Sequence, residues 1–137
     1  MKTCSFCQLV DDRDELLVVG AHSAAFLDVN PIRPGHVLIT PKEHEPDFFN
    51  LDDEVHLDIM RLAKRVARAQ QRVFSPLRVG LLVAGMDIPH AHVHLIPMHD
   101  YHDVTSKRML EGAVTRAGED ELNEHRLRLS RALRRAG

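Results

Sequence analysis

The sequence contains no run of about 18 consecutive apolar residues, the length that predicts a membrane-spanning helix. Its charges nearly balance, with a formal net charge of -2 at pH 7, so the overall charge gives no reason to expect nucleic acid or a membrane as a partner. An anionic ligand would have to be held by local groups. The sequence also shows no signal-peptide pattern, no internal repeat and no low-complexity segment, and a cytoplasmic location is therefore expected.

Cysteine is scarce, since only Cys4 and Cys7 occur, as a C-x-x-C pair. In a reducing compartment this spacing favours a metal site over a structural disulfide, and it is common in structural zinc sites. The pair predicts half of such a site. A redox pair fits less well, because the motif precedes the first predicted strand, and two reduced cysteines without a ligand are the other alternative. The histidines that could complete the site are His36, His44, His90, His99 and His102.

The composition, 44% hydrophobic and 28% charged in 137 residues, is typical of a single globular domain. Apolar runs between turn formers predict strands at 16–19, 24–27, 36–40 and 79–84, of which the first two form a hairpin and the last is central and buried. Apolar residues at helical spacing predict a helix from about Asn50 to Ser75, packed on the sheet, and another from about Asp120 to Ala136. The polar residues 98–103 predict an exposed loop.

Histidine recurs at every second position in His90, His92 and His94, with apolar residues between. This is the period of a β-strand, so the stretch 90–97 predicts a strand with imidazoles on one face and apolar side chains on the other. Three imidazoles on one face are costly in a packed core, because each ring nitrogen needs a hydrogen-bond partner or a metal. The stretch therefore predicts a functional site.

Phosphoryl chemistry suits this face, because a neutral imidazole is a competent nucleophile near pH 7. His92 can attack phosphorus if its other ring N–H is held by a carbonyl or carboxylate, while His94 hydrogen-bonds the phosphoryl oxygens or the leaving group. Gly85 would let backbone amides approach the same phosphate. A metal centre of three histidines is the competing interpretation, but side chains two and four residues apart on a flat strand diverge too far for all three to bind one ion.

On these residues the chain resembles the histidine triad superfamily of nucleotide hydrolases and transferases. The similar segments extend over residues 4 to about 97 and are Cys4-x-x-Cys7, Phe26-Leu27-Asp28, Pro34-Gly35-His36-Val37-Leu38-Ile39, Pro41-Lys42-Glu43-His44 and the histidine stretch. The resemblance implies an α+β fold with an antiparallel sheet of about five strands, one long helix and a C-terminal helix, usually paired as a homodimer. We expect one domain over residues 1–137, with the motifs in 4–97 and a C-terminal loop and helix in 98–137.

The resemblance also implies roles for individual residues. His92 would attack the α-phosphorus of a nucleotide derivative and form a nucleotidyl-histidine that water cleaves, with His94 assisting. Asp28 would bind the ribose hydroxyls, although it could instead cap a turn. The expected nucleotide-binding residues are Asp28, Phe26, Gly85 and His94. A structural zinc ion would be held by Cys4, Cys7, His44 and His90, and His36 is either an orienting residue or a buried core histidine.

The expected activity is hydrolysis of nucleoside phosphoramidates or dinucleoside polyphosphates at the α-phosphate, with AMP-type purine nucleotides as substrates and no nucleic acid or membrane partner. The chain departs from the family pattern after Gly85, where Met86 and Asp87 replace an amide and a hydroxyl side chain. Asp87 would repel a phosphate unless it is turned away or protonated; it could also cap the turn or act as a general acid. A catalytically silent nucleotide-binding or scaffold protein is therefore the alternative function.

Overall fold

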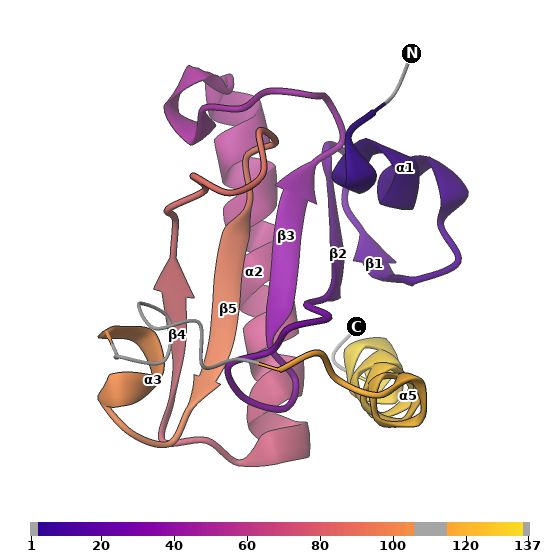
Figure 1. Ribbon diagram of the computed structural model, residues 1–137, viewed down its shortest axis with the longest axis vertical. Coiled ribbons are helices and arrows are strands. Elements are labelled where there is room, and N and C mark those ends of the chain that lie inside the picture. The colour runs from indigo at the N-terminus through magenta and orange to yellow at the C-terminus, as the bar shows by residue number, and fades with distance from the viewer. Residues whose placement is uncertain (1–2, 106–114, 136–137) are drawn as a thin grey trace.

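The computed structural model describes residues 3–105 and 115–135, which form a five-stranded sheet and several helices. The strands are β1 Leu16–Val19, β2 Ser23–Leu27, β3 Val37–Pro41, β4 Arg78–Leu82 and β5 Val93–Met98. The helices are α1 Ser5–Asp12, the 3-10 helix η1 Phe48–Asn50, α2 Asp53–Phe74, α3 His102–Thr105 and α5 Glu119–Arg135. The sheet order is β1-β2-β3-β5-β4 with antiparallel neighbours throughout, as Figure 1 shows. The predicted α+β fold and the predicted hairpin are therefore confirmed.

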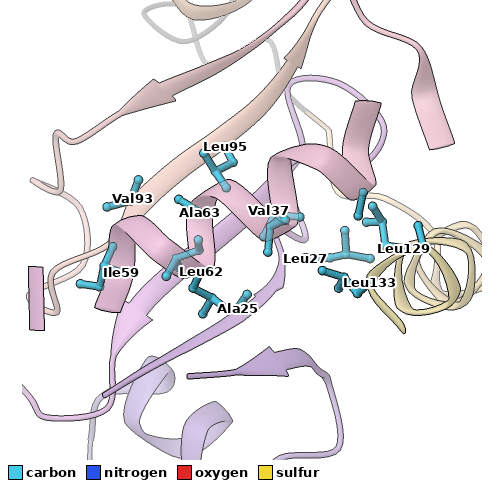
Figure 2. Packing of buried hydrophobic residues seen from close by; sticks show 14 of the residues in the cluster. Ala25, Leu27, Val37, Ile59, Leu62, Ala63, Val93, Leu95, Leu129 and Leu133 are labelled. Carbon is cyan, nitrogen blue, oxygen red and sulfur yellow. The ribbon is translucent and has the colours of Figure 1, made fainter. Parts of the chain in front are cut away.

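The long helix α2 covers one face of the sheet (Figure 1). Its apolar residues recur at helical spacing, and Ile59, Leu62 and Val66 are buried in the core cluster. Figure 2 shows Ile59 and Leu62 beside the strands of the sheet. The helix begins at Asp53 instead of Asn50, because Asn50 belongs to η1. It ends where the sequence predicts, before Ser75 and Pro76.

The two faces of the sheet differ because side chains alternate along each strand. Val93 belongs to the core cluster beneath α2, whereas Leu38 and Phe26 form a second cluster with Phe6 of α1. Leu38 in β3 is the register partner of His94 in β5, so His94 lies on the face opposite α2. This alternation separates the hydrophobic core from the face that carries the histidines.

The segment 79–84, predicted as a central buried strand, is instead at the edge of the sheet. The strand β4 ends at Leu82 and pairs with β5, which lies between β4 and β3. Leu81 is 44% exposed. The prediction was wrong because a short apolar run does not specify the order of strands, which distant pairing decides.

The strand β5 begins at Val93 and not at the predicted His90. The backbone before Val93 makes other hydrogen bonds. The His90 N–H donates to the nearby Ile88 carbonyl at 2.8 Å, and the Ala91 N–H donates to the Glu45 carbonyl, in the segment after β3, at 2.7 Å. His90 and His92 therefore precede the regular strand. No helix within the described ranges combines the length and the apolar character needed to cross a membrane.

The C-terminal part is partly as predicted. The helix α5 buries Leu122, Leu129 and Leu133 as expected, whereas Ala136 lies outside the described residues. The prediction of an exposed loop over 98–103 is wrong for Asp103, which is 2% exposed and lies in α3. Its carboxylate accepts a hydrogen bond from Arg33 Nε at 2.9 Å, so α3 is tied to the loop before β3.

Candidate active site and metal centre

His92 has one ring nitrogen bound and the other available. Its Nδ1 lies 2.8 Å from the backbone carbonyl oxygen of His90. Since a carbonyl can only accept, Nδ1 carries the ring proton, and Nε2 of the neutral ring keeps a free lone pair. This is the arrangement that a nucleophilic imidazole requires.

The loop before the histidine stretch passes beside the ring of His92. Gly85 adopts a left-handed backbone with φ of 72°. A Cβ atom added at Gly85 would lie 3.7 Å from Cε1 of His92, which is ordinary contact, so the backbone angle is the stronger reason for glycine here. The next side chain, Met86, is 94% exposed.

His94 is oriented by His36 through a short chain of hydrogen bonds. The Ile32 backbone N–H donates to Nδ1 of His36 at 3.1 Å, so the His36 ring proton must be on Nε2. That nitrogen lies 2.9 Å from Nδ1 of His94 and donates to it. His94 therefore carries its own proton on Nε2. With its ring centroid 5.0 Å from that of His92, His94 can donate a hydrogen bond to a group that His92 attacks.

Burial keeps the hydrogen-bond relay of His36 and His94 in its neutral form. It lowers the pKa of His36 to about 4, against a smaller opposite effect of Asp28, whose Oδ2 lies 3.6 Å from His36 Nε2. Burial and the neighbouring His92 also lower the pKa of His94, while the carboxylates of Asp28 and Asp87 raise it. The tautomers inferred from the hydrogen bonds are thus those of uncharged rings at neutral pH.

Asp28, His36 and His94 bring ligand atoms within 4.8 Å of one another, so a metal ion is the other conceivable use of this group. The hydrogen bond from Ile32 argues against it. A metal on Nε2 of His36 would leave that ring without a proton on either nitrogen, which is unfavourable near neutral pH. The group is better explained as a hydrogen-bond relay.

A second group does suit a metal ion, and its members are Cys4, Cys7, His44 and His90. Their ligand atoms all lie within 4.8 Å of one another. His44 follows β3 and His90 precedes β5, and Figure 1 shows the end of β3 beside the start of β5. Nδ1 of His90 lies 3.4 Å from Sγ of Cys4 and 3.5 Å from Sγ of Cys7, and Nδ1 of His44 lies 3.4 Å from Sγ of Cys7. Neither cysteine is in a disulfide.

The chemistry of these four donors fits a tetrahedral ion. Zinc bonds of about 2.3 Å to sulfur and about 2.1 Å to nitrogen place the two kinds of ligand atom roughly 3.5 Å apart. His90 is prepared for this role, because its Nε2 donates to the Pro41 carbonyl at 2.9 Å and its Nδ1 therefore keeps a lone pair. Burial lowers the pKa of His90, which also favours the neutral ring.

The other predicted site residues, Asp28 and Phe26, have structural contacts of their own. Asp28 caps a turn, since its Oδ1 accepts from the Asn30 N–H at 2.8 Å, while its Oδ2 faces His36. Phe26 is 3% exposed and packs against Phe6, with ring centroids 5.1 Å apart. Among the described residues, His99 and His102 are in neither group of potential ligands.

Phe6 is a site residue that the sequence analysis did not identify. It lies between the two cysteines in α1, and its ring meets the ring of His92 edge-on, with centroids 5.2 Å apart and planes at 90°. The only signal in the sequence is its position inside the C-x-x-C motif. Nothing in that position shows that Phe6 packs against a residue so distant in the chain.

Two yeast proteins are similar in sequence to this chain over about 100 residues. Adenosine 5'-monophosphoramidase of Schizosaccharomyces pombe is 37% identical over 98 residues, which are 69% of this chain and 74% of that protein. Adenosine 5'-monophosphoramidase of Saccharomyces cerevisiae is 35% identical over 102 residues, which are 71% of this chain and 63% of that protein.

The fold is shared with solved structures. A crystal structure of a zinc-bound histidine triad family protein from Mycobacterium smegmatis has a TM-score of 0.77 and 22% identity, and covers 97% of this chain and 94% of that chain. A model of the HIT domain family matches residues 13–101, which include β1 to β5 and all three histidines of the triad. The chain therefore belongs to the HIT domain family.

Proposed function

We propose that this protein hydrolyses nucleoside 5'-phosphate derivatives at the α-phosphate, with phosphoramidates of AMP as the leading substrate class and dinucleoside polyphosphates as the second. The observation that carries the proposal is the free Nε2 of His92 beside the Nε2–H of His94. The yeast relatives named adenosine 5'-monophosphoramidases support the phosphoramidate class.

The first step forms a bond from Nε2 of His92 to the α-phosphorus, and the bond from phosphorus to the leaving nitrogen or oxygen breaks. The leaving group departs with that electron pair and takes up a proton from solvent. The charge that develops on the phosphoryl oxygens is met by the Nε2–H of His94, which the relay from His36 holds in its donor form. The His90 carbonyl keeps the proton on Nδ1 of His92 throughout.

The second step is hydrolysis of the nucleotidyl-histidine. Water bonds to phosphorus through its oxygen and releases a proton to solvent, while the bond from phosphorus to Nε2 of His92 breaks and its electron pair returns to Nε2. The mononucleotide then leaves. Asp28 would hold the ribose hydroxyls through Oδ2, since its Oδ1 is used by the turn. We assign nucleotide contacts also to Gly85 and His94, whereas the buried Phe26 would support the pocket from beneath Phe6.

We also propose that the ion held by Cys4, Cys7, His44 and His90 is a structural zinc. Bound there, it would join α1 to the loop after β3 and to the start of the histidine stretch. Its donor set and the spacing of its ligand atoms support zinc. Elemental analysis of the purified protein should find one zinc per chain, and Cys7→Ser should lose it.

A homodimer in the cytoplasm is the proposed working form. Among the described strands, β4 has a neighbour on one side only, and Leu81 on it is 44% exposed. On α2, Leu57 and Met60 are 56% and 51% exposed. Such apolar surface favours association with a second copy. Light scattering coupled to gel filtration tests this assembly, and a monomeric mass would contradict it.

The direct test of the proposed function is the release of AMP from adenosine 5'-phosphoramidate. Wild type should turn the substrate over, whereas His92→Asn should lower kcat by a factor on the order of 10³ or more and still bind AMP within about threefold of wild type. A protein that binds AMP but shows no turnover would instead support the alternative function, a silent nucleotide-binding or scaffold protein.

A further inference from the structure

The short helix α1 connects the metal centre with the nucleophile. Cys4 and Cys7 supply two of the potential metal ligands, and Phe6 between them packs edge-on against His92, with ring centroids 5.2 Å apart. The Phe6 ring also contacts Phe26 and is 5% exposed. The N-cap residue and the first turn of α1 thus carry two of the four potential metal ligands and the ring that packs against His92.

His90 makes the same connection through its backbone. Its Nδ1 faces the two cysteine sulfurs, while its carbonyl oxygen accepts the Nδ1–H of His92 at 2.8 Å. The adjacent Ala91 N–H donates to the carbonyl of Glu45, which follows the ligand His44 in the chain. The backbone that orients His92 is therefore attached to two of the four ligands.

We propose that the metal centre positions the nucleophile: binding of the ion fixes α1 and His90, and these hold His92 through the Phe6 ring and the His90 carbonyl. Phe6 and His90 are positioning residues in this account, which rests on the proposed function of His92.

The shortness of α1 explains why the ion matters. The helix has eight residues, and isolated helices shorter than about 12 residues are marginal in water, so α1 depends on its tertiary contacts. These contacts include the small apolar cluster of Phe6, Phe26 and Leu38 with its neighbours. Without the ion, no metal coordination joins the two cysteines to His44 and His90. The Phe6 ring and the His90 carbonyl are then held less firmly, so the ring of His92 is free to turn and to exchange tautomers.

The primary experiment compares zinc-loaded protein with protein stripped by a chelator, using long-range 1H–15N NMR of the histidine rings. In the loaded protein His92 should show a single Nδ1–H tautomer, and in the stripped protein a mixture. The rate at which adenosine 5'-phosphoramidate modifies His92 should fall about 10-fold to 100-fold, the usual effect of removing an orienting group. An unchanged tautomer and rate in the stripped protein would overturn the proposal.

A pair of variants separates positioning from loss of the ion. His44→Ala removes a ligand, whereas His44→Cys keeps four donors that zinc accepts, so the first variant should behave as stripped protein and the second as loaded protein. Equal His92 tautomers and equal rates in the two variants, with zinc bound only by His44→Cys, would contradict the proposal.

The contact of Phe6 is tested in the loaded protein, where unfolding of a metal-free form plays no part. Phe6→Leu should keep one zinc per chain but slow the modification of His92. Leu9→Ala, in the same helix and packed against the same cluster, should keep the wild-type rate. A wild-type rate in Phe6→Leu would remove Phe6 from the account. If loaded wild type is not modified at all, the proposed function fails, and the tautomer comparison still decides whether the metal positions His92.

Discussion

Nε2 of His36 donates a hydrogen bond to Nδ1 of His94 at 2.9 Å, and Nδ1 of His36 accepts one from the backbone of Ile32. Two rings and one amide therefore determine which nitrogen of His94 carries a proton. As a consequence, Nε2 of His94 presents an N–H donor, and not a lone pair, beside His92. His36 acts on the reaction through His94 and is a positioning residue.

Substitution of His36 tests this relay. His36→Leu should lower kcat about 10-fold to 100-fold with little change in KM, because His94 can then take either tautomer. His36→Gln should retain more of the activity, since its amide N–H can still donate to His94. Steady-state kinetics with adenosine 5'-phosphoramidate provide both values. A Leu variant with wild-type kcat would show that the relay is not needed.

The same residue should make folding stability depend on pH. Burial lowers the pKa of His36 from 6.5 to about 4, so between these values the unfolded chain binds a proton that the folded chain does not. The contribution of neutral His36 to the free energy of unfolding is fully present above pH 6.5 and is lost as the pH falls toward 4. Urea unfolding at pH 7 and pH 4.5 should show a loss of roughly 2 to 3 kcal/mol from this source. His36→Gln should remove that part of the slope, and an equally steep loss in this variant would contradict the assignment.

Asp87 places a negative charge near the phosphate site, as its effect on the pKa of His94 indicates. Asp87→Asn should therefore tighten AMP binding by about 3-fold to 10-fold, as expected for removing one repulsion of about 1 kcal/mol, and leave kcat unchanged. Asp120→Asn, on the exposed start of α5, is the matched control and should have no effect. A large fall in kcat would instead indicate that Asp87 acts as a general acid. Calorimetric titration with AMP and steady-state kinetics distinguish these results.

Gly35 is required by the packing of α2 on the turn before β3. Its φ is 84°, and a Cβ atom there would collide with the ring of Phe74. Gly35→Ala should lower the free energy of unfolding by roughly 2 to 4 kcal/mol, because backbone strain and overpacking add. Gly118→Ala meets nothing within 4 Å and is the control. Similar urea midpoints for the two variants would contradict this account.

The local pattern of the sequence predicts much of this fold. Alternation around the triad correctly assigns Val93 to the core, and helical spacing correctly predicts Leu129 and Leu133 as buried. In both cases the information lies within a few residues. The order of the strands does not, and for this reason the apolar segment of β4 was assigned to the centre of the sheet when it forms an edge.

The site residues likewise depend on contacts between distant parts of the chain, which local pattern does not predict. The C-x-x-C pair predicts two ligands, but Cys7 lies 37 residues from His44 and 83 from His90, so the full set came from the family resemblance and not from spacing. The role of His36 stayed open, because its hydrogen bond spans 58 residues. Asp103 was misassigned for the same reason, since its partner Arg33 is 70 residues away.

The central claim is that His92 forms a covalent bond to the α-phosphorus of a nucleotide. The most direct test is intact-protein mass spectrometry after brief exposure to adenosine 5'-phosphoramidate and quenching in base, in which a phosphorus–nitrogen bond to histidine survives. The account predicts a mass gain of one AMP unit on wild type, mapped to His92, and no gain on His92→Asn. Release of AMP without an adduct on His92, or an adduct that persists in His92→Asn, would contradict it.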